Sequence, residues 1–276
     1  MLTITTCLAY PEPPSNLLPL ADALTRDGIP TAFAPWQNRP KSAFILPLCA
    51  WDYAAVPEAF GQWLTEAEAG GQRFINPVGL MRWNMDKRYL CDLAEWGADV
   101  IPSVQTSSEK EKLEEVLESR GWREAVVKPV IGQSGRGVVK IRAGEVSLNA
   151  EDYPQGVIVQ PYIREIETAG ETSLVFLDGR FSHAVLRMPS QGEWRANSAY
   201  GVAVSPTAPP EKAVETARQI LDMLPQMPAY ARIDGTLIGD RLLLNELELI
   251  EPALYLHTAE NAVADMAQAV KRVIAG

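Results

Sequence analysis

Short apolar runs and amphipathic segments alternate along the first quarter of the chain. Residues 2–9, 29–34 and 42–48 are apolar runs typical of buried strands, and residues 17–27 and 58–69 have the apolar spacing of helices that end at glycines. Such an alternation is typical of a parallel sheet with helices on its faces. We therefore expect a small α/β domain whose ligands bind beyond the carboxyl ends of its strands.

The pattern changes in the second half of the chain to strands with little helix between them. Residues 81–96 and 108–120 predict two helices that precede this change. The later strand-like segments are 125–128, 138–142, 157–162, 172–177, 181–187, 230–235 and 241–249, with helices at 212–224 and 259–274. The proline-rich residues 11–14 and 206–210 are expected in loops. This part is therefore predicted to be α+β and mostly antiparallel.

Composition and charge restrict the possible functions. The chain has 276 residues, with 25 Lys and Arg against 35 Asp and Glu, so its formal charge is −10. An acidic surface disfavours nucleic acid and anionic membranes as partners. Two histidines are too few for a multi-histidine zinc site, and three widely spaced cysteines argue against a disulfide framework. Because the chain also lacks a basic signal-peptide region and an apolar run of ~20 residues, we expect a cytoplasmic protein.

A glycine-rich loop between two strand-like segments is the first candidate for nucleotide binding. Gly132, Gly135 and Gly137 follow a G-x-x-G-x-G order and enclose Gln133 and Ser134. This order, and the strand-like segment after it, differ from the Rossmann and Walker A motifs, which open a helix. The pattern predicts a hairpin whose tip covers phosphates with backbone N–H groups. The alternative is a flexible hairpin that binds nothing.

Two lysines are candidates for contacts with the phosphates. Lys128 lies on the strand that leads into the loop, four residues before Gly132, where its ammonium group could reach them. Lys87 lies in the segment predicted as a helix, where it would share a partly apolar face with Trp83 and Leu90. A lysine on such a face either meets a ligand or is an ordinary solvated charge.

Three carboxylates lie on two predicted neighbouring strands near the C-terminus. Glu246 and Glu248 alternate along one strand and point to the same side, and Asp234 lies on the paired strand. With no basic residue expected between them, they need solvent or a divalent cation, and hard oxygen ligands suit Mg²⁺ or Mn²⁺. The alternative is an exposed acidic ribbon, which the apolar residues around them disfavour. Glu251 is a reserve ligand for the same metal.

Basic and aromatic residues complete the candidate site. Arg187 ends a strand and Arg195 and Asn197 lie in a loop, and we expect all three to stabilise a transferring phosphoryl group. Contacts with the substrate are expected mainly beyond the carboxyl ends of the N-terminal strands. The candidates are Tyr10, Trp51, Asp52, Tyr53 and Arg82, although a packing role is the alternative for Trp51 and Tyr53.

Six of these motifs occur in an order that resembles the ATP-grasp ligases, over about residues 76–252. The resemblance implies that Lys87 and Lys128 bind the nucleotide and that residues 132–138 (GQSGRGV) form the phosphate lid. It also implies that Glu171 binds the ribose. The backbone of the hinge strand would read adenine, at Gln160, Pro161, Tyr162 and Ile163.

The resemblance also implies a metal site and a domain organisation. Asp234, Glu246 and Glu248 match the family's metal carboxylates, although the third of these is usually asparagine. The implied structure is an ATP-grasp fold, in which a small N-terminal parallel α/β domain precedes two antiparallel α+β subdomains that enclose the nucleotide. The expected divisions are 1–78 for the N-terminal substrate domain and 79–276 for the ATP-grasp domain, with a lid at about 99–160 and a catalytic subdomain at about 161–276.

Within the family, residues 192–197 (GEWRAN) are similar to the branch that contains glutathione synthetase and the ribosomal-protein glutamate ligase. Residues 51–53, 82–90 and 246–252 are similar to the cyclo-ligases that close O-ureidoserine to cycloserine. The implied activity is magnesium- and ATP-dependent ligation of a small amino-acid-like carboxylate to an amine, through an acylphosphate, with a homodimer expected. The alternatives are a small-molecule kinase and a nucleotide-binding module without turnover.

Overall fold

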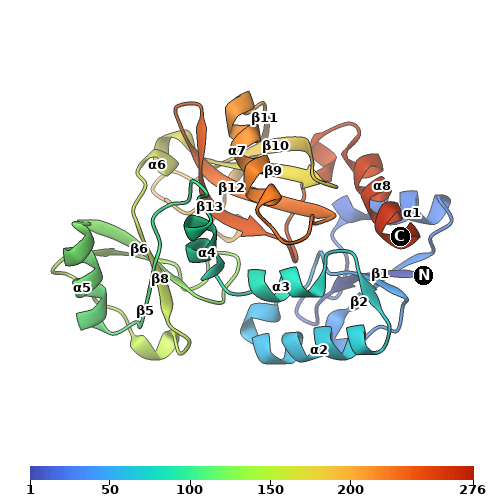
Figure 1. Cartoon of the computed structure of the whole chain (residues 1–276), viewed down its shortest axis with the longest axis horizontal. Helices are drawn as coiled ribbons and strands as arrows, with labels where there is room; N and C mark the ends of the chain where they lie inside the picture. Colours follow the sequence, from blue (N-terminus) through green and yellow to red (C-terminus); the bar gives the residue numbers. More distant parts are fainter.

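A computed structural model describes the whole chain, Met1–Gly276, and contains three sheets. We name them the N-terminal sheet (residues 2–74), the lid sheet (residues 104–161) and the large sheet (residues 171–248). Figure 1 shows the N-terminal and lid sheets at opposite ends of the molecule, and the large sheet between and above them. The mixture of one parallel and two antiparallel sheets confirms the predicted fold class.

The N-terminal sheet is parallel, as the alternation of strands and helices predicts. Its strand order is β2-β1-β3-β4. The strands are β1 (Leu2–Thr6), β2 (Thr31–Pro35), β3 (Phe44–Leu46) and β4 (Arg73–Phe74), with helices α1 (Leu18–Arg26) and α2 (Pro57–Ala69). The two helices cover opposite faces, since α1 packs with Ile4 and α2 with Ile45. The first strand is shorter than predicted because Cys7 pairs with Tyr10 in a tight turn.

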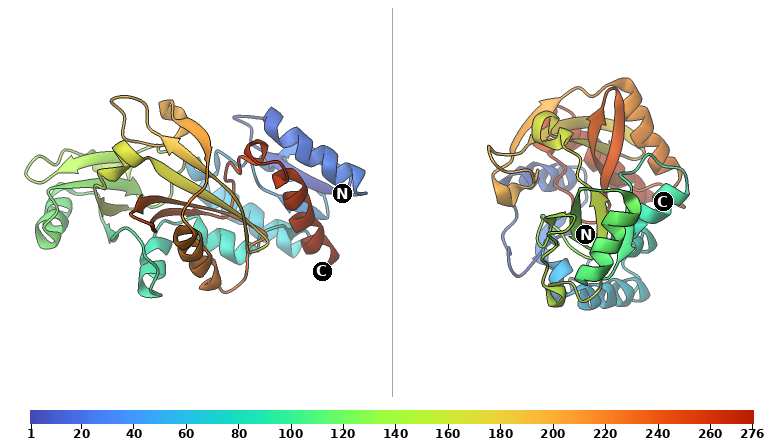
Figure 2. Two further views of the ribbon diagram at one scale, coloured as in Figure 1. Left: turned by 90° about the horizontal axis from the view of Figure 1, so that it is seen from above. Right: turned by 90° about the vertical axis from the view of Figure 1, so that its left-hand side faces the viewer.

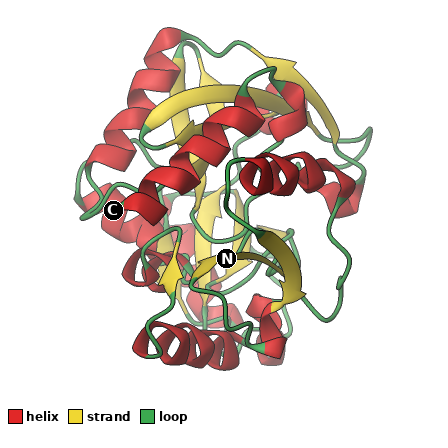
Figure 3. Ribbon diagram, turned by 90° about the vertical axis from the view of Figure 1, so that its right-hand side faces the viewer, coloured by secondary structure: helices red, strands yellow, loops and turns green.

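The C-terminal helix packs back onto the N-terminal sheet. Helix α8 (Ala262–Ala275) lies against α1, and Met266 and Val270 share one buried core with Leu20 and Leu24. Both ends of the chain therefore lie on the same side of the molecule (Figure 3). This packing ties the last residues of the chain to the domain formed by the first.

The lid sheet is antiparallel, with the order β5-β8-β6-β7. Its strands are β5 (Val104–Thr106), β6 (Glu124–Pro129), β7 (Val139–Arg142) and β8 (Val157–Pro161). Helix α5 (Lys110–Arg120) buries Leu113 and Leu117 against Val127 and Val159, and ends at Gly121. The glycine-rich loop joins β6 to β7, so the predicted hairpin is confirmed.

The large sheet is also antiparallel and has the order β11-β10-β9-β12-β13. Its strands are β9 (Glu171–Leu177), β10 (Arg180–Met188), β11 (Ala203–Thr207), β12 (Tyr230–Ile238) and β13 (Arg241–Glu248), with helices α6 (Glu165–Ala169) and α7 (Glu211–Asp222). Pro206 lies in β11 and not in a loop, which corrects the prediction for residues 206–210. The strand is at an edge of the sheet, where a missing N–H is tolerated. Helix α7 packs on one face of this sheet, where Ala217 and Ile220 share a buried core with Leu242 and Leu244 (Figure 2).

The predicted helix over residues 81–96 is wrong, because two short helices replace it. They are α3 (Val78–Asn84) and α4 (Tyr89–Glu95), and Lys87 lies in the turn between them. The Lys87 N–H donates to the carbonyl of Val130 (2.7 Å), and Asp86 accepts from the N–H of Arg88 (3.0 Å). These bonds to the lid and to a side chain take the place of helical ones.

Six short 3₁₀ helices lie between the longer elements. The 3₁₀ helices are Ser15–Leu17, Trp36–Asn38, Tyr53–Ala55, Ala150–Asp152, Ser198–Tyr200 and Leu256–Thr258. Cys7, Cys49 and Cys91 are unpaired, which confirms the expectation that there is no disulfide framework. None of the helices combines the length and the apolar character that crossing a bilayer requires.

A bulge shapes the end of β13 that carries the predicted metal ligands. Asp234 pairs with Glu246, whereas the next residue, Gly235, pairs with Leu244, so Asn245 is the extra residue. A Cβ on Gly235 would lie 2.4 Å from the carbonyl oxygen of Leu243, so only glycine fits there. The bulge lets two successive residues, Asn245 and Glu246, face the same cleft.

We predict that Asn76→Ala destabilises the protein by about 3 kcal/mol or more, since each buried group left unpaired costs ~1–3 kcal/mol. The Asn76 side chain is fully buried and bonds the carbonyls of Tyr230 and Leu249 and the N–H of Ala229. Urea unfolding would measure the change. Asn38→Ala is the matched control, because Asn38 is exposed. Equal stabilities of the two variants would contradict this role of Asn76.

Candidate active site

A cleft between the lid sheet and the large sheet brings most of the predicted nucleotide-binding residues together, and we name it the nucleotide cleft. The members of the predicted set that line it are Lys87, Lys128, Gly132, Gln133, Ser134, Gly135, Gln160, Pro161, Tyr162, Ile163 and Glu171. Gly137 is the exception, since it does not line the cleft and its carbonyl accepts a hydrogen bond from Tyr153 (2.8 Å). The Gln160 side-chain amide nitrogen donates to the Ser103 hydroxyl (3.0 Å).

The two predicted lysines are buried at the floor of this cleft. Lys128 donates to the side-chain oxygen of Asn245 (2.6 Å), and burial lowers its pKa to about 8. Lys87 forms an ion pair with Glu246. Burial alone would lower the pKa of Lys87, but Glu246 and the neighbouring carboxylates outweigh burial and raise it. Both lysines therefore present buried, poorly hydrated ammonium groups to the cleft.

The tip of the lid hairpin contacts the loop between β10 and β11. The backbone adopts positive φ at Ser134 (56°) and Gly135 (70°). A Cβ on Gly135 would lie 2.7 Å from the side-chain oxygen of Asn197, and the Tyr200 hydroxyl donates to the Gly135 carbonyl (3.2 Å). Glycine is needed here because the two loops approach so closely. This contact holds Asn197 at the mouth of the cleft.

The predicted arginines have different surroundings. Arg195 lines the nucleotide cleft, where it bonds Glu193 (2.8 and 2.9 Å) and stacks 3.6 Å above the centre of the Tyr200 ring. It forms no ion pair with the three carboxylates. Arg187 is buried among them, 2.7 Å from Asp234, and also bonds Glu171.

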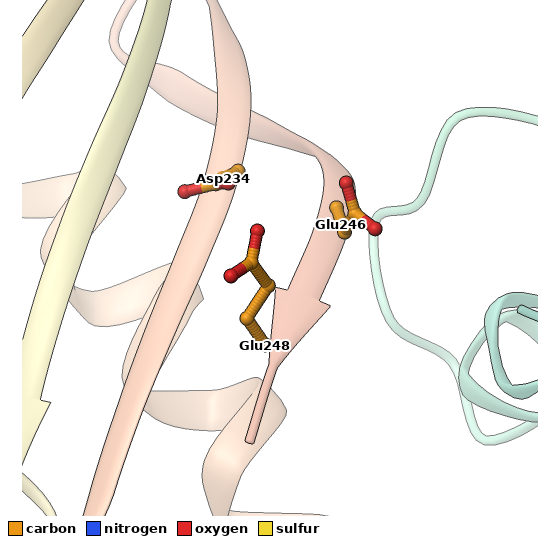
Figure 4. A group of neighbouring side chains, drawn as sticks. All are labelled: Asp234, Glu246 and Glu248. Carbon is orange, nitrogen blue, oxygen red and sulfur yellow. The ribbon is translucent and has the colours of Figure 1, made fainter. Parts of the chain in front are cut away.

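The three predicted metal carboxylates meet at the junction of β12 and β13. Figure 4 shows Asp234 on one strand and Glu246 and Glu248 on its neighbour. One oxygen from each lies within 4.8 Å of the others, whereas Glu251 is outside this group. Three hard oxygen donors at this spacing fit a divalent cation such as Mg²⁺.

The expectation that no basic residue lies between these carboxylates is wrong. Arg232 bonds both oxygens of Asp234 (2.9 and 2.8 Å) and forms an ion pair with Glu248. Arg187 forms a second ion pair with Asp234 (2.7 Å). Arg232 precedes Asp234 by two residues on β12 and so points to the same side. That spacing is the signal by which the sequence could have revealed Arg232.

Burial and ion pairing set the charges of the three carboxylates. Burial alone would raise the pKa of Asp234, but Arg187 and Arg232 outweigh burial and lower this pKa. Lys87 and Lys128 lower the pKa of Glu246 in the same way. Burial dominates at Glu248 and raises its pKa to about 7. A cation bound by the group would favour the charged form of Glu248.

Side chains from the α3–α4 segment hold the free edge of β13. Asn84 accepts from the N–H of Leu249 (2.8 Å) and donates to the carbonyl of Leu247 (2.7 Å). The Tyr89 hydroxyl accepts from the N–H of Leu247 (2.9 Å). These bonds act as a neighbouring strand would, so the residues that carry Glu246 and Glu248 are fixed on both sides.

A second cavity of about 620 Å³ lies between the N-terminal sheet and the carboxylates. It adjoins the nucleotide cleft, since Lys87 and Glu246 line both. Tyr10, Trp51 and Tyr53, three of the candidates for substrate contacts, line it.

Two other candidates for substrate contacts do not reach this cavity. Asp52 accepts hydrogen bonds from Trp36 (2.7 Å) and Gln37 (2.6 Å). Arg82 bonds the Gly61 carbonyl and Thr65 on the outer surface. Because their hydrogen-bonding groups are satisfied locally, we correct both from substrate contacts to structural residues.

Trp51 links three parts of the molecule at this cavity. Its indole N–H donates to the carbonyl of Glu251 (3.2 Å), and its own carbonyl accepts from the Gln133 side chain at the lid tip. Gln133 also accepts from the N–H of Ala54 (3.4 Å). Trp51, which belongs to the N-terminal domain, therefore contacts both the lid and the segment that follows β13.

Comparison with known families accounts for nearly the whole chain. The family "Prokaryotic glutathione synthetase, ATP-grasp domain" matches residues 92–253, which is more than half of the chain. The family "D-cycloserine synthetase DcsG, N-terminal domain" matches residues 2–76.

Individual relatives agree with these families. The cycloserine biosynthesis protein DcsG of Streptomyces lavendulae is 29% identical over 72% of this chain and 72% of its own length. A glutathione synthetase of Synechocystis sp. is 31% identical over 51% of this chain, and the match spans only 43% of that relative. The crystal structure of D-cycloserine synthetase DcsG superimposes with a TM-score of 0.83 and 26% identity over 99% of both chains. A D-alanine–D-alanine ligase from Bacillus anthracis shares the fold, with a TM-score of 0.64 and 13% identity over 99% of this chain and 96% of its own.

We predict that Lys128→Met weakens the binding of ATP by about tenfold to a hundredfold, the scale of one lost hydrogen bond to a charged group. Isothermal titration with ATP and Mg²⁺ would measure the affinity. Lys41→Met is the matched control, because Lys41 is exposed. Unchanged affinity in Lys128→Met would contradict a role for Lys128 in binding phosphates.

The affinity for ATP should also fall as the pH rises, because the pKa of Lys128 is about 8 and the neutral amine no longer attracts phosphate. Bound phosphate favours the charged form, so the dissociation constant should rise by up to about tenfold per pH unit above that pKa. The same titrations between pH 6.5 and 9 would measure the slope. Lys128→Met should show a flatter profile, and equal slopes in both proteins would refute the assignment.

Proposed function

Because the chain belongs to the ATP-grasp ligase family, whose members form carbon–nitrogen bonds, we propose that it ligates a small amino-acid-like carboxylate to an amine through an acylphosphate. The observation that carries this proposal is the adjacency of two cavities. The nucleotide cleft and the second cavity share Lys87 and Glu246, so the phosphate end of a nucleotide would face a substrate in the second cavity.

The first step would be attack by a carboxylate oxygen on the γ-phosphorus of ATP, with ADP as the leaving group. Arg187 and Arg232 both line the second cavity, and each pairs with carboxylates of the protein. The Nε–H of Arg187 has no partner in the protein and is the donor that we assign to the substrate carboxylate, together with the positive charge of both groups. Lys87 and Lys128 lie on the nucleotide side, where they would bind phosphate oxygens. Opposed donors of this kind hold the two reactants in line and stabilise charge on the transferring group.

The divalent cation of the family fits the carboxylate group. Asp234, Glu246 and Glu248 would hold it, and when bound it neutralises charge on the phosphates of ATP. Arg195 and Asn197 line the nucleotide cleft together with Glu246, and we assign them to the oxygens of the transferring phosphoryl group. Arg195 and Asn197 would thus act without forming a covalent bond to substrate.

The second step would be attack by an amine nitrogen on the acyl carbon, with release of phosphate and loss of one proton from nitrogen. An acylphosphate reacts with water, so the site must be closed at this stage. The contacts of the lid tip with Trp51 and with the loop that carries Asn197 support closure, since Gln133 and Gly135 bridge to both. No nucleophilic side chain of the protein is needed.

We further propose that acid and amine belong to one molecule, so that the reaction closes a ring. The match of residues 2–76 to the N-terminal domain of D-cycloserine synthetase supports this form, because that part of the chain supplies Tyr10, Trp51 and Tyr53 to the second cavity. An intermolecular ligase would require a second amine for turnover.

A panel of D- and L-amino acids and their ureido derivatives, incubated with ATP and Mg²⁺, would test the proposed function. We expect ADP and inorganic phosphate in equal amounts with one substrate and no added amine. ADP with a stable phosphorylated product and no free phosphate would instead identify a kinase. ADP formation that requires a second amine would exclude ring closure but not ligation.

We predict that Glu246→Gln lowers turnover by about a hundredfold or more, the scale of losing one group that stabilises charge in a transition state. Far-UV circular dichroism should be unchanged, since the side chain keeps its shape. Glu145→Gln is the control, because Glu145 is exposed on the lid. Full turnover by Glu246→Gln at saturating Mg²⁺ would refute the assignment of the metal site.

A further inference from the structure

The second cavity contains one carboxyl group that no other side chain of the protein satisfies. Glu251 lines this cavity, directly after the strand end that carries Glu246 and Glu248. Each of those two glutamates forms an ion pair, with Lys87 and Arg232 respectively. Glu251 forms none, and it is outside the group of oxygens that fits a metal. Its carboxyl group is therefore available to a ligand.

Hydrogen bonds hold the backbone on both sides of Glu251. Trp51 donates to the Glu251 carbonyl (3.2 Å), and the Tyr230 hydroxyl donates to the carbonyl of Ile250 (2.8 Å). Arg232 bonds the carbonyl of Ala253 (3.1 Å). Groups held in this way from both sides are suited to recognition, because little ordering is left for the ligand to impose.

The walls of the cavity carry groups that suit a cation and groups that suit an anion. Tyr10 and Trp51 meet edge to face, with ring centres 6.3 Å apart, and Tyr255 also lines the cavity. Aromatic faces attract ammonium groups. Arg187 and Arg232 lie in the same cavity and attract a carboxylate. A ligand with one positive and one negative group matches both sets of residues.

The raised pKa of Glu251 is consistent with a site for a cationic group. Burial raises its pKa well above the usual range, and repulsion by Glu248 adds to the effect. A carboxyl group with a raised pKa and no side-chain partner is stabilised in its charged form by a nearby cation. A bound ammonium group would supply that cation.

We infer that Glu251 binds the ammonium group of a zwitterionic, amino-acid-like substrate, while Arg187 and Arg232 bind its carboxylate. This inference rests on the proposed function and adds the residue that separates amino acids from simple carboxylic acids. Glu251 is thus a specificity-determining residue for the substrate and not a ligand of the metal.

The test compares each amino acid that supports ADP release with its 2-hydroxy analogue, which lacks the ammonium group. We expect wild-type kcat/KM to favour the amino acid by at least about a hundredfold, as sites built around a substrate's polar group do. Glu251→Gln should lose most of this preference through a higher KM for the amino acid, while kcat/KM for the hydroxy acid stays within threefold. Glu260→Gln, at an exposed position nearby, should behave as wild type.

The outcomes separate this inference from the proposed function. If no acid in the panel raises ADP release, the proposed function fails. If ADP release depends on an acid but wild type accepts both analogues equally, or Glu251→Gln keeps the preference, the inference alone is overturned. A variant whose defect is a higher Mg²⁺ requirement, with the preference intact, would identify Glu251 as a metal ligand and also overturn it.

Discussion

The site depends on the burial of opposite charges close to one another. The cations are Lys87, Lys128, Arg187 and Arg232, and the carboxylates are Glu171, Asp234, Glu246 and Glu248. A buried charge is costly unless it is paired, and removing one partner leaves the other uncompensated. Because these groups come from the lid sheet, the large sheet and the α3–α4 turn, the charges can balance only when all three parts are in place. The packing of the three parts and the pairing of the buried charges therefore depend on each other.

This balance changes what the net charge of the chain says about its ligand. The chain carries −10 overall, yet four buried cations lie among the carboxylates of the site. The acidic excess belongs to the outer surface, and so it does not oppose a nucleotide whose phosphates are neutralised by divalent cations. The protein cations face phosphate and carboxylate groups from two sides, which suits transfer of a phosphoryl group between them.

Much of the fold and part of the site could be predicted from the sequence. The alternation of strands and helices, the glycine-rich hairpin and the same-side spacing of Glu246 and Glu248 are local patterns, and the structure contains all of them. The rest depends on contacts between distant residues. Lys87 leaves the predicted helix because its N–H bonds Val130 in the lid, and Asn245 enters the cleft because of the bulge at Gly235. Neither the partner strand nor the bulge is visible in the local sequence.

The central claim is that the substrate carboxylate is activated as an acylphosphate. The most direct measurement uses a substrate labelled with ¹⁸O in both carboxylate oxygens and follows the label by mass spectrometry of the released phosphate. Attack by the carboxylate on the γ-phosphorus of ATP predicts that each phosphate released carries one ¹⁸O from the substrate. Phosphate released without the label, during normal turnover, would contradict the account.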